Sequence, residues 1–224
     1  MTKKITITLF ILALFTSCGG RRTVVQDPAT FDEGVVINGI RWATRNVDAP
    51  GTFAESPESA GMLFQWNRKR GWSFPAILKY VNYLEELERW ECIEELEVYF
   101  EQMLAEWDST EAEGTRWYAE NDPCPPGWRV PTLQELQFLT AVSIWTTHNG
   151  VNGRLFGTAP NQIFLPAVGS PYDLDSNTRG FYWSSTECPE YNSAWYLDFA
   201  TEHKGKGYFA GRAFTVSIRC VSIE

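Results

Sequence analysis

The chain has 224 residues, a formal net charge of −9 and an aromatic content of 15%, with ten tryptophans. This length is enough for one well-cored domain and marginal for two. So acidic a surface repels nucleic acid phosphates and is not drawn to anionic lipid headgroups, which excludes nucleic acid as a partner and favours a glycan or protein ligand.

The first twenty residues, MTKKITITLFILALFTSCGG, predict a signal peptide over residues 1–17. Two lysines precede an apolar run that is too short to cross a bilayer as a helix. The stretch from Phe15 to Cys18 resembles a bacterial lipobox, in which cleavage precedes a cysteine that is then acylated. We therefore predict lipidation at Cys18, with simple secretion as the alternative because Phe15 departs from the usual aliphatic residue.

Lipidation would attach the protein to the outer membrane, facing the periplasm or the cell surface, and the lipid would be its only contact with the membrane. Cleavage would also remove two lysines, leaving 17 basic against 28 acidic residues and a formal charge of 17 − 28 = −11. Residues 18–34 lack periodic apolar content and predict a tether. A β signal, VVINGIRWATRNVDAPG, then places the start of the domain near Val35.

Apolar residues recur at steps of three and four from about Pro75 to Trp107, which predicts a helix. Nine glutamates and one basic residue, Arg89, lie between Glu85 and Glu106. One interpretation is an amphipathic helix with a solvated acidic face, and the other is a helix that docks a partner. The sequence leaves both open.

A second helix is predicted in WRVPTLQELQFLTAV, where Thr132 and Glu135 have the spacing of a capping box. Leu133, Leu136, Leu139 and Val142 would lie along one side of it.

Four short β runs follow: IFLPAVG, GFYWSST, SAWYLDFA and AFTVSIRC. By the two-residue period of strands, the residues Phe214, Val216, Ile218 and Cys220 share one face, and so do Trp195, Leu197 and Phe199, which leaves Tyr196 and Asp198 on the opposite side. The glycine-rich stretch 205–211 does not have the spacing of a nucleotide-binding loop, and we interpret it as a flexible turn.

Four cysteines remain after Cys18, at positions 92, 124, 188 and 220, and spacing alone permits three pairings. None has the CxxC spacing of a zinc or redox site, and the chain has two histidines only. We predict structural disulfides, no metal and no cofactor.

Several strings together carry a resemblance to a known family: INGIRWATRNVDAPGTF, GMLFQWNRKRGW, NDPCPPGWRVPTLQEL, NGVNGRLF, IFLPAVG, GFYWSST, AWYLDF and VSIRCV. They resemble the Fibrobacter succinogenes major paralogous domain of Bacteroidetes lipoproteins, over residues 35–74 and 117–224. The resemblance implies an α+β, C-type-lectin-like domain over residues 35–224, with the acidic helix as an insertion at 76–110.

The resemblance further implies that the first and last strands pair, that the capped helix packs on them, and that Cys124 forms a disulfide with Cys220. For Cys92 and Cys188 two possibilities stay open, a second disulfide or a free Cys92. The calcium-binding triplets of sugar-binding lectins of that fold are absent.

We predict a non-catalytic glycan- or protein-binding domain, in which exposed aromatic rings and neighbouring amides or carboxylates hold the ligand. Trp183 and Trp195 are expected to belong to the core. One alternative is a structural or assembly subunit of a cell-envelope or fimbrial structure, and another is a glycoside hydrolase using Glu187, Glu190 and Asp198. The oligomeric state is not predicted. The candidate binding residues are Tyr172, Asp173, Asn177, Tyr191, Asn192, Tyr196, His203 and Tyr208.

Overall fold

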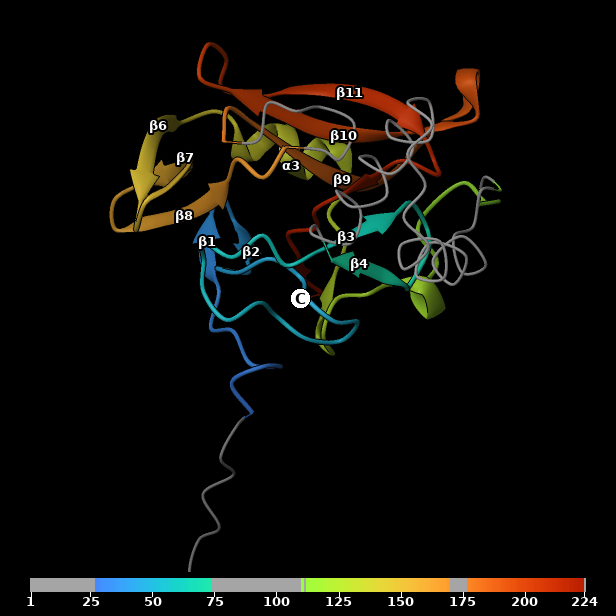
Figure 1. The fold of residues 1–224 in the computed structure, drawn as a ribbon, viewed down its shortest axis with the longest axis horizontal. Helices are drawn as coiled ribbons and strands as arrows, with labels where there is room; N and C mark the ends of the chain where they lie inside the picture. Colours follow the sequence, from blue (N-terminus) through green and yellow to red (C-terminus); the bar gives the residue numbers. More distant parts are fainter. Residues whose placement is uncertain (1–26, 74–109, 111, 170–176, 224) are drawn as a thin grey trace, which may run out of the picture.

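The computed structural model describes residues 27–73, 110, 112–169 and 177–223, and strands dominate them (Figure 1). Among the described residues, thirteen strands form four small antiparallel sheets, accompanied by one α-helix, α3 (Leu133–Leu139), and two 3-10 helices, η1 (Ala119–Asn121) and η2 (Pro189–Tyr191). The predicted α+β, C-type-lectin-like fold is therefore wrong. No helix among the described residues is long and apolar enough to span a membrane. The strands are β1 (Val35–Ile37), β2 (Ile40–Trp42), β3 (Met62–Gln65), β4 (Gly71–Ser73), β5 (Trp128–Arg129), β6 (Ser143–His148), β7 (Val151–Thr158), β8 (Asn161–Pro166), β9 (Arg179–Cys188), β10 (Ser193–Ala200), β11 (Lys206–Gly211), β12 (Thr215–Val216) and β13 (Val221–Ser222).

The helical contribution is small because α3 is short. Its capping box forms as predicted, since the Glu135 amide donates to the Thr132 hydroxyl while the Glu135 carboxylate accepts from the Thr132 amide. The helix ends at Leu139, however, and Val142 lies beyond it with 53% of its surface exposed. The predicted helix at 76–110 lies outside the described residues, apart from Thr110.

The two ends of the domain meet in one sheet, of order β1-β2-β13-β5. Asn38 and Gly39 both have positive φ, 52° and 81°, as a two-residue type I′ hairpin turn between β1 and β2 requires. Val221 of β13 pairs with Trp42 of β2, so the last strand joins the sheet of the first strand but pairs with β2, and the implied direct pairing of first and last strands is wrong. The order of this sheet places C-terminal β13 between β2 and β5.

Part of the predicted tether packs on the domain. Asp32 is 8% exposed, its carboxylate accepts from the amide and hydroxyl of Thr44, and it forms an ion pair with Arg45 at 3.3 Å. The folded domain thus begins upstream of Val35. Residues 1–26 lie outside the described part of the chain, and with them Cys18.

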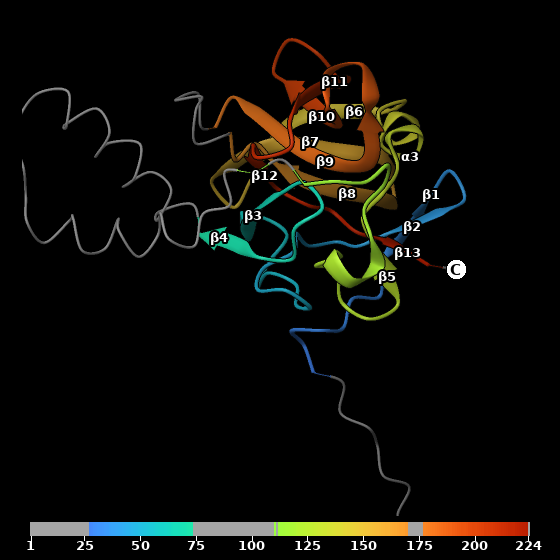
Figure 2. The ribbon, with the colours of Figure 1, turned by 90° about the vertical axis from the view of Figure 1, so that its right-hand side faces the viewer.

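Strands β11, β10 and β9 form a three-stranded sheet beside α3 (Figures 1 and 2). Its two faces contribute side chains to two different apolar clusters. Tyr182, Leu197 and Phe199 belong to one, beside Leu136 and Leu139 of α3, so the helix packs against this sheet. The other cluster uses the opposite face. Its members from this sheet are Phe181, Trp183, Ala194 and the partly buried Tyr196.

Three of the four predicted β runs are strands β8, β9 and β10, but only Thr215 and Val216 of the fourth form one, β12. Within that run Val216, Ile218 and Cys220 are buried in one cluster, as predicted, and Phe214 packs against it. The predicted flexible turn at 205–211 is wrong, because Lys206–Gly211 is strand β11. Tyr208 of β11 pairs with Tyr196 of β10, and Phe209 pairs with Trp195. These cross-strand aromatic contacts stabilise β11 although it contains two glycines.

A fully buried arginine ties the C-terminal segment to distant parts of the chain. The Arg219 guanidinium donates to Asn46 Oδ1 at 2.7 and 3.0 Å, to the Ala43 carbonyl at 3.2 Å and to the Phe164 carbonyl at 3.0 Å. Burial lowers its pKa to about 10, which still leaves it charged at neutral pH. Its four hydrogen bonds replace the water that burial removes.

The disulfide implied by the resemblance is present between Cys124 and Cys220. Cys188 is a buried free thiol, whose pKa burial raises. Because Cys188 is free, the possible second disulfide to Cys92 is wrong; Cys92 itself lies outside the described residues.

Candidate ligand-binding cavity

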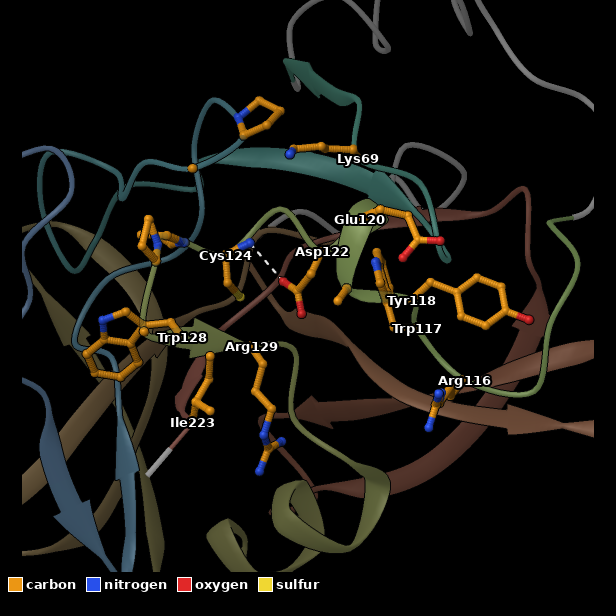
Figure 3. A pocket seen from close by; sticks show the side chains of 16 residues that line it. Lys69, Arg116, Trp117, Tyr118, Glu120, Asp122, Cys124, Trp128, Arg129 and Ile223 are labelled. Atoms are coloured by element: carbon orange, nitrogen blue, oxygen red, sulfur yellow. Dashed lines mark hydrogen bonds between the residues drawn. The ribbon is translucent and has the colours of Figure 1, made fainter.

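A cavity of about 720 Å³ lies where the disulfide loop meets the turn after β3 (Figure 3). Its floor is built by the run Pro125-Pro126-Gly127, in which the Trp128 amide donates to the Pro125 carbonyl and Gly127 has φ +87°. These are the features of a type II turn, with proline at its second position and glycine at its third. The lining residues are 50–51, 69, 116–120, 122, 124–129 and 223.

Two tryptophan rings belong to the wall. Trp117 is 7% exposed, packs edge-on against Trp66 with ring centres 5.9 Å apart, and donates its indole N–H to the Asn121 carbonyl at 2.9 Å. Trp128 is half-buried and packs edge-on against Phe53 at 5.6 Å. Both rings are held by contacts behind them, so the wall is preformed.

Asp122 is the fixed polar group of the cavity, and Figure 3 shows it between Trp128 and Trp117 in that view. One carboxylate oxygen accepts from the Cys124 amide at 2.9 Å and the other from the Val130 amide at 3.0 Å. Burial raises the pKa of Asp122, although the two amides and the charges of Arg129 and Lys69 oppose the shift. Its carboxylate is thus oriented and partly desolvated.

The three cations of the wall differ in what they contact. Arg129 binds Glu135 through two hydrogen bonds of 2.7 and 2.9 Å, so its charge is satisfied within the protein. Burial raises the pKa of Glu135, but the hydrogen bonds from Arg129 and from the Thr132 amide outweigh it and leave the pKa below 4.5. Lys69 and Arg116 are exposed, and neither forms an ion pair with any residue of the described ranges.

A second cavity of about 370 Å³ adjoins the first and shares Arg116, Trp117, Asp122 and Arg129 with it. Ser185 and Thr186 of β9 belong to its lining, because residues 115–117 run beside that strand: the Trp117 amide donates to the Ser185 carbonyl, and Arg116 forms an isolated bridge with Thr186. The combined cavity therefore follows the β9 edge of the β11-β10-β9 sheet, which we call the central sheet.

None of the binding residues predicted from sequence lines this cavity. Tyr191, which is 60% exposed, stacks on Phe209 of β11 with ring centres 4.5 Å apart and an interplanar angle of 3°. Tyr208 is 44% exposed and stacks on the half-buried Tyr196 at 6.4 Å. Asn192 follows Tyr191 with φ +47° and ends η2. These four predicted residues do gather around β10 and β11, so a binding role there stays a prediction.

The remaining predicted residues are dispersed. Asn177 is exposed, and its carbonyl accepts from Asn152 at 3.1 Å. His203 lies 3.9 Å from Asp198, and its Nδ1 is buried with no hydrogen-bond partner. Tyr172 and Asp173 lie outside the described residues. In the part of the chain that the structure describes, no three histidine, cysteine, aspartate or glutamate side chains gather as a metal site.

Of the two framework tryptophans, Trp183 is fully buried as predicted. Trp195 is only half-buried, and it lies edge-on to Phe209 at 5.6 Å.

The carboxylates considered for glycoside hydrolysis are not grouped across a cleft. Asp198 is 1% exposed and ion-paired with Arg179 at 2.6 Å, whereas Glu187 is paired with Arg212 at 3.4 Å. In the β9–β10 register Glu187 lies opposite Ala194, four residues along β10 from Asp198, or about 13 Å. Catalytic carboxylate pairs lie within roughly 5–9.5 Å of each other.

No protein-family model matches the chain, and neither a curated protein nor a solved structure is significantly similar to it.

Proposed function

We propose that the protein is a non-catalytic binding protein for an oligosaccharide that carries a carboxylate group. One observation carries this: the 720 Å³ cavity combines tryptophan rings, a fixed carboxylate and two exposed cations that form no ion pair with a described residue. Aromatic rings pack against the apolar faces of sugars. Asp122 is oriented to accept from sugar hydroxyls, and Lys69 and Arg116 supply charge-assisted donors for a carboxylate. The volume lies within the range of roughly 300–1,000 Å³ typical of small-ligand sites.

The test is a glycan array that contains uronic acid and neutral oligosaccharides, followed by calorimetry on the hits. Arg116→Met and Lys69→Met remove exposed charges that form no ion pair in the described protein, so both variants should fold. We expect each to weaken binding about tenfold or more, as loss of a hydrogen bond to a charged group does. Lys204→Met, which removes an exposed cation outside the cavity, is the matched control. Unchanged binding in both cavity variants would refute the proposed site.

The same assay tests the loop predicted from sequence. Tyr191→Ala and Asn192→Ala should leave carboxylated-glycan binding unchanged if the cavity holds the ligand. Loss of binding in these two variants, with Arg116→Met unaffected, would move the site to the loop around η2.

Hydrolysis is measured on the same hits. Release of reducing sugar that Asp122→Asn abolishes would contradict a non-catalytic role. We expect no release, and we expect weaker binding by Asp122→Asn, because an amide can accept from only one of the two backbone amides that now hold the carboxylate.

We infer export and a lipid anchor from the N-terminal sequence, which lies outside the described residues. The supporting feature is the short apolar run followed by Cys18. Cys18→Ala should shift the protein from the outer-membrane fraction to the soluble fraction. Retention of the variant in the membrane would contradict the anchor.

A further inference from the structure

Strand β11 forms one margin of the central sheet, with β10 on its inner side (Figure 1). It runs for six residues, from Lys206 to Gly211, without a proline or a bulge in its pairing with β10. Proteins commonly protect such margins with prolines, bulges, charges or a covering segment, because an open strand edge is a template for another strand. Here the one charged residue of the strand is Lys206, at its start.

The hydrogen-bond pattern tells which backbone groups of β11 face outward. In β9 the Trp183 amide donates to the Ser217 carbonyl, on the side away from β10. The backbone groups of the neighbouring Tyr182 therefore point toward β10, where Tyr182 pairs with Leu197. In an antiparallel strand successive residues alternate sides. The backbone N–H and C=O groups of Tyr196 and Asp198 therefore point toward β11, and those of Leu197 point toward β9.

Across β10, Tyr196 lies opposite Tyr208 and Asp198 opposite Lys206. The same alternation then directs the N–H and C=O groups of Gly207 and Phe209 away from β10. In the described part of the chain no hydrogen bond reaches these outward backbone groups of Gly207 and Phe209. The outer side of β11 thus presents two donors and two acceptors in the spacing of a strand.

Large exposed rings accompany this open edge. Tyr208 is 44% exposed and Phe209 40% exposed, and Phe209 is stacked under Tyr191, which is 60% exposed. Aromatic rings with a rigid backing are the side chains most enriched at the centres of protein interfaces.

We propose that β11 pairs antiparallel with β11 of a second copy of this chain, which joins two central sheets into one of six strands. The pairing that uses the outward groups of Gly207 and Phe209 places Gly207 opposite Phe209 of the second copy and Phe209 opposite its Gly207. A two-fold axis then passes between the two Tyr208 residues. This register is self-complementary, as a closed two-fold dimer requires.

Charge also permits this register. Lys206 lies opposite Ala210 of the second copy, so the two Lys206 residues are about 13 Å apart and do not repel at close range. Each Lys206 lies next to Asp198 of its own chain in the β10–β11 register.

Cysteine substitution tests the register directly. In the proposed dimer the two Tyr208 residues form a pair without mutual backbone hydrogen bonds, with Cα atoms about 4.5 Å apart, within the range that a disulfide spans. We expect the Tyr208→Cys chain to form a disulfide-linked dimer under mild oxidation. Lys206→Cys is the matched control, with the same native cysteines and a separation beyond the reach of a disulfide. Equal cross-linking in both variants would overturn the register.

Proline tests the backbone contribution. Gly207→Pro removes one outward N–H per chain and leaves the β10 hydrogen bonds in place, whereas Gly207→Ala keeps that N–H. Both add a Cβ that meets the mobile end of Leu133 at 3.0 Å, so this contact does not distinguish the two variants. In sedimentation of the purified mature chain we expect a dimer whose dissociation constant rises roughly tenfold or more with proline relative to alanine.

A chain that stays monomeric at all concentrations would overturn the proposal. So would a dimer in which Tyr208→Cys forms no cross-link, because the interface would then lie elsewhere. If Tyr208→Cys instead cross-links to a different protein in cells, the edge has another occupant and the second copy is excluded.

Discussion

Removal of the Cys124–Cys220 disulfide should cause the largest loss of stability of any single covalent change in the described protein. The two cysteines are 96 residues apart in sequence, so the bond closes a loop of about 97 residues. In the chain-entropy model such a loop lowers the entropy of the unfolded chain by about 16 cal/mol/K, or about 4.7 kcal/mol at 25 °C. For a domain of this size that corresponds to a fall in Tm of roughly 10–19 °C.

The assay is urea unfolding of the Cys124→Ala/Cys220→Ala variant beside the oxidised wild type, with the slope m compared as well as the midpoint. Cys188→Ala is the control, because it removes a buried sulfur that closes no loop, at a cost of about 1 kcal/mol. A loss of about 1 kcal/mol or less in the double variant, with m unchanged, would refute the loop-closure reasoning. Since Cys124 lines the cavity and its amide orients Asp122, ligand affinity should also fall in the double variant.

Three other substitutions have outcomes that the structure sets. Gly180→Ala would place a Cβ 2.1 Å from the Phe199 ring, so we expect a loss of about 2 kcal/mol in thermal unfolding, and an unchanged Tm would contradict the close packing. Arg219→Met leaves the Asn46 side chain and two carbonyls without their buried donors, which should cost about 3 kcal/mol in urea unfolding. Glu135 has a pKa below 4.5 in the folded protein, so its pairing with Arg129 stabilises the fold above that pH and is lost as the pH falls through the folded value. Glu135→Gln should therefore destabilise by about 1 kcal/mol at pH 7 and by less near pH 3, and a deficit independent of pH would contradict this sign.

The features that were predictable from sequence are those whose cause lies within a few residues. The capping box of α3 needs Thr132 and Glu135 alone, so it followed from local chemistry; the β1–β2 turn, which we did not predict, also needs only Asn38 and Gly39. The apolar neighbours of Trp183 in GFYWSST likewise identified it as core, and the alternation in residues 193–199 placed Leu197 and Phe199 on one buried face.

Strand β11 could not be predicted in this way. Its glycines indicate a turn, yet Tyr208 and Phe209 meet aromatic partners on β10 only once the intervening turn has closed. Pairing, and not local preference, makes this segment a strand. The same reason applies to the fold class, because the short strands owe their stability to neighbours that are distant in the chain.

The cavity escaped sequence analysis because its wall is assembled from four separated segments, around residues 50, 69, 116–129 and 223. The string NDPCPPGWR contains Asp122, Cys124, Trp128 and Arg129, but its composition alone does not indicate a site. The disulfide to Cys220, the contact of residues 115–117 with β9, and backbone hydrogen bonds from Gly51 to Pro123 and from Ile223 to Gly127 bring the wall together.

The proposed ligand cavity and the proposed dimer contact lie at opposite edges of the central sheet. The cavity follows the β9 edge, and the dimer would form at β11, two strands away, so pairing leaves both cavities open. A dimer then presents two sites at the two ends of a six-stranded sheet and binds a repeating polysaccharide with an effective concentration set by the fixed distance between them. We expect Gly207→Pro to weaken retention on immobilised polysaccharide strongly while leaving calorimetric affinity for a short oligosaccharide unchanged. Equal loss in both measurements would show that the edge and the cavity are not independent.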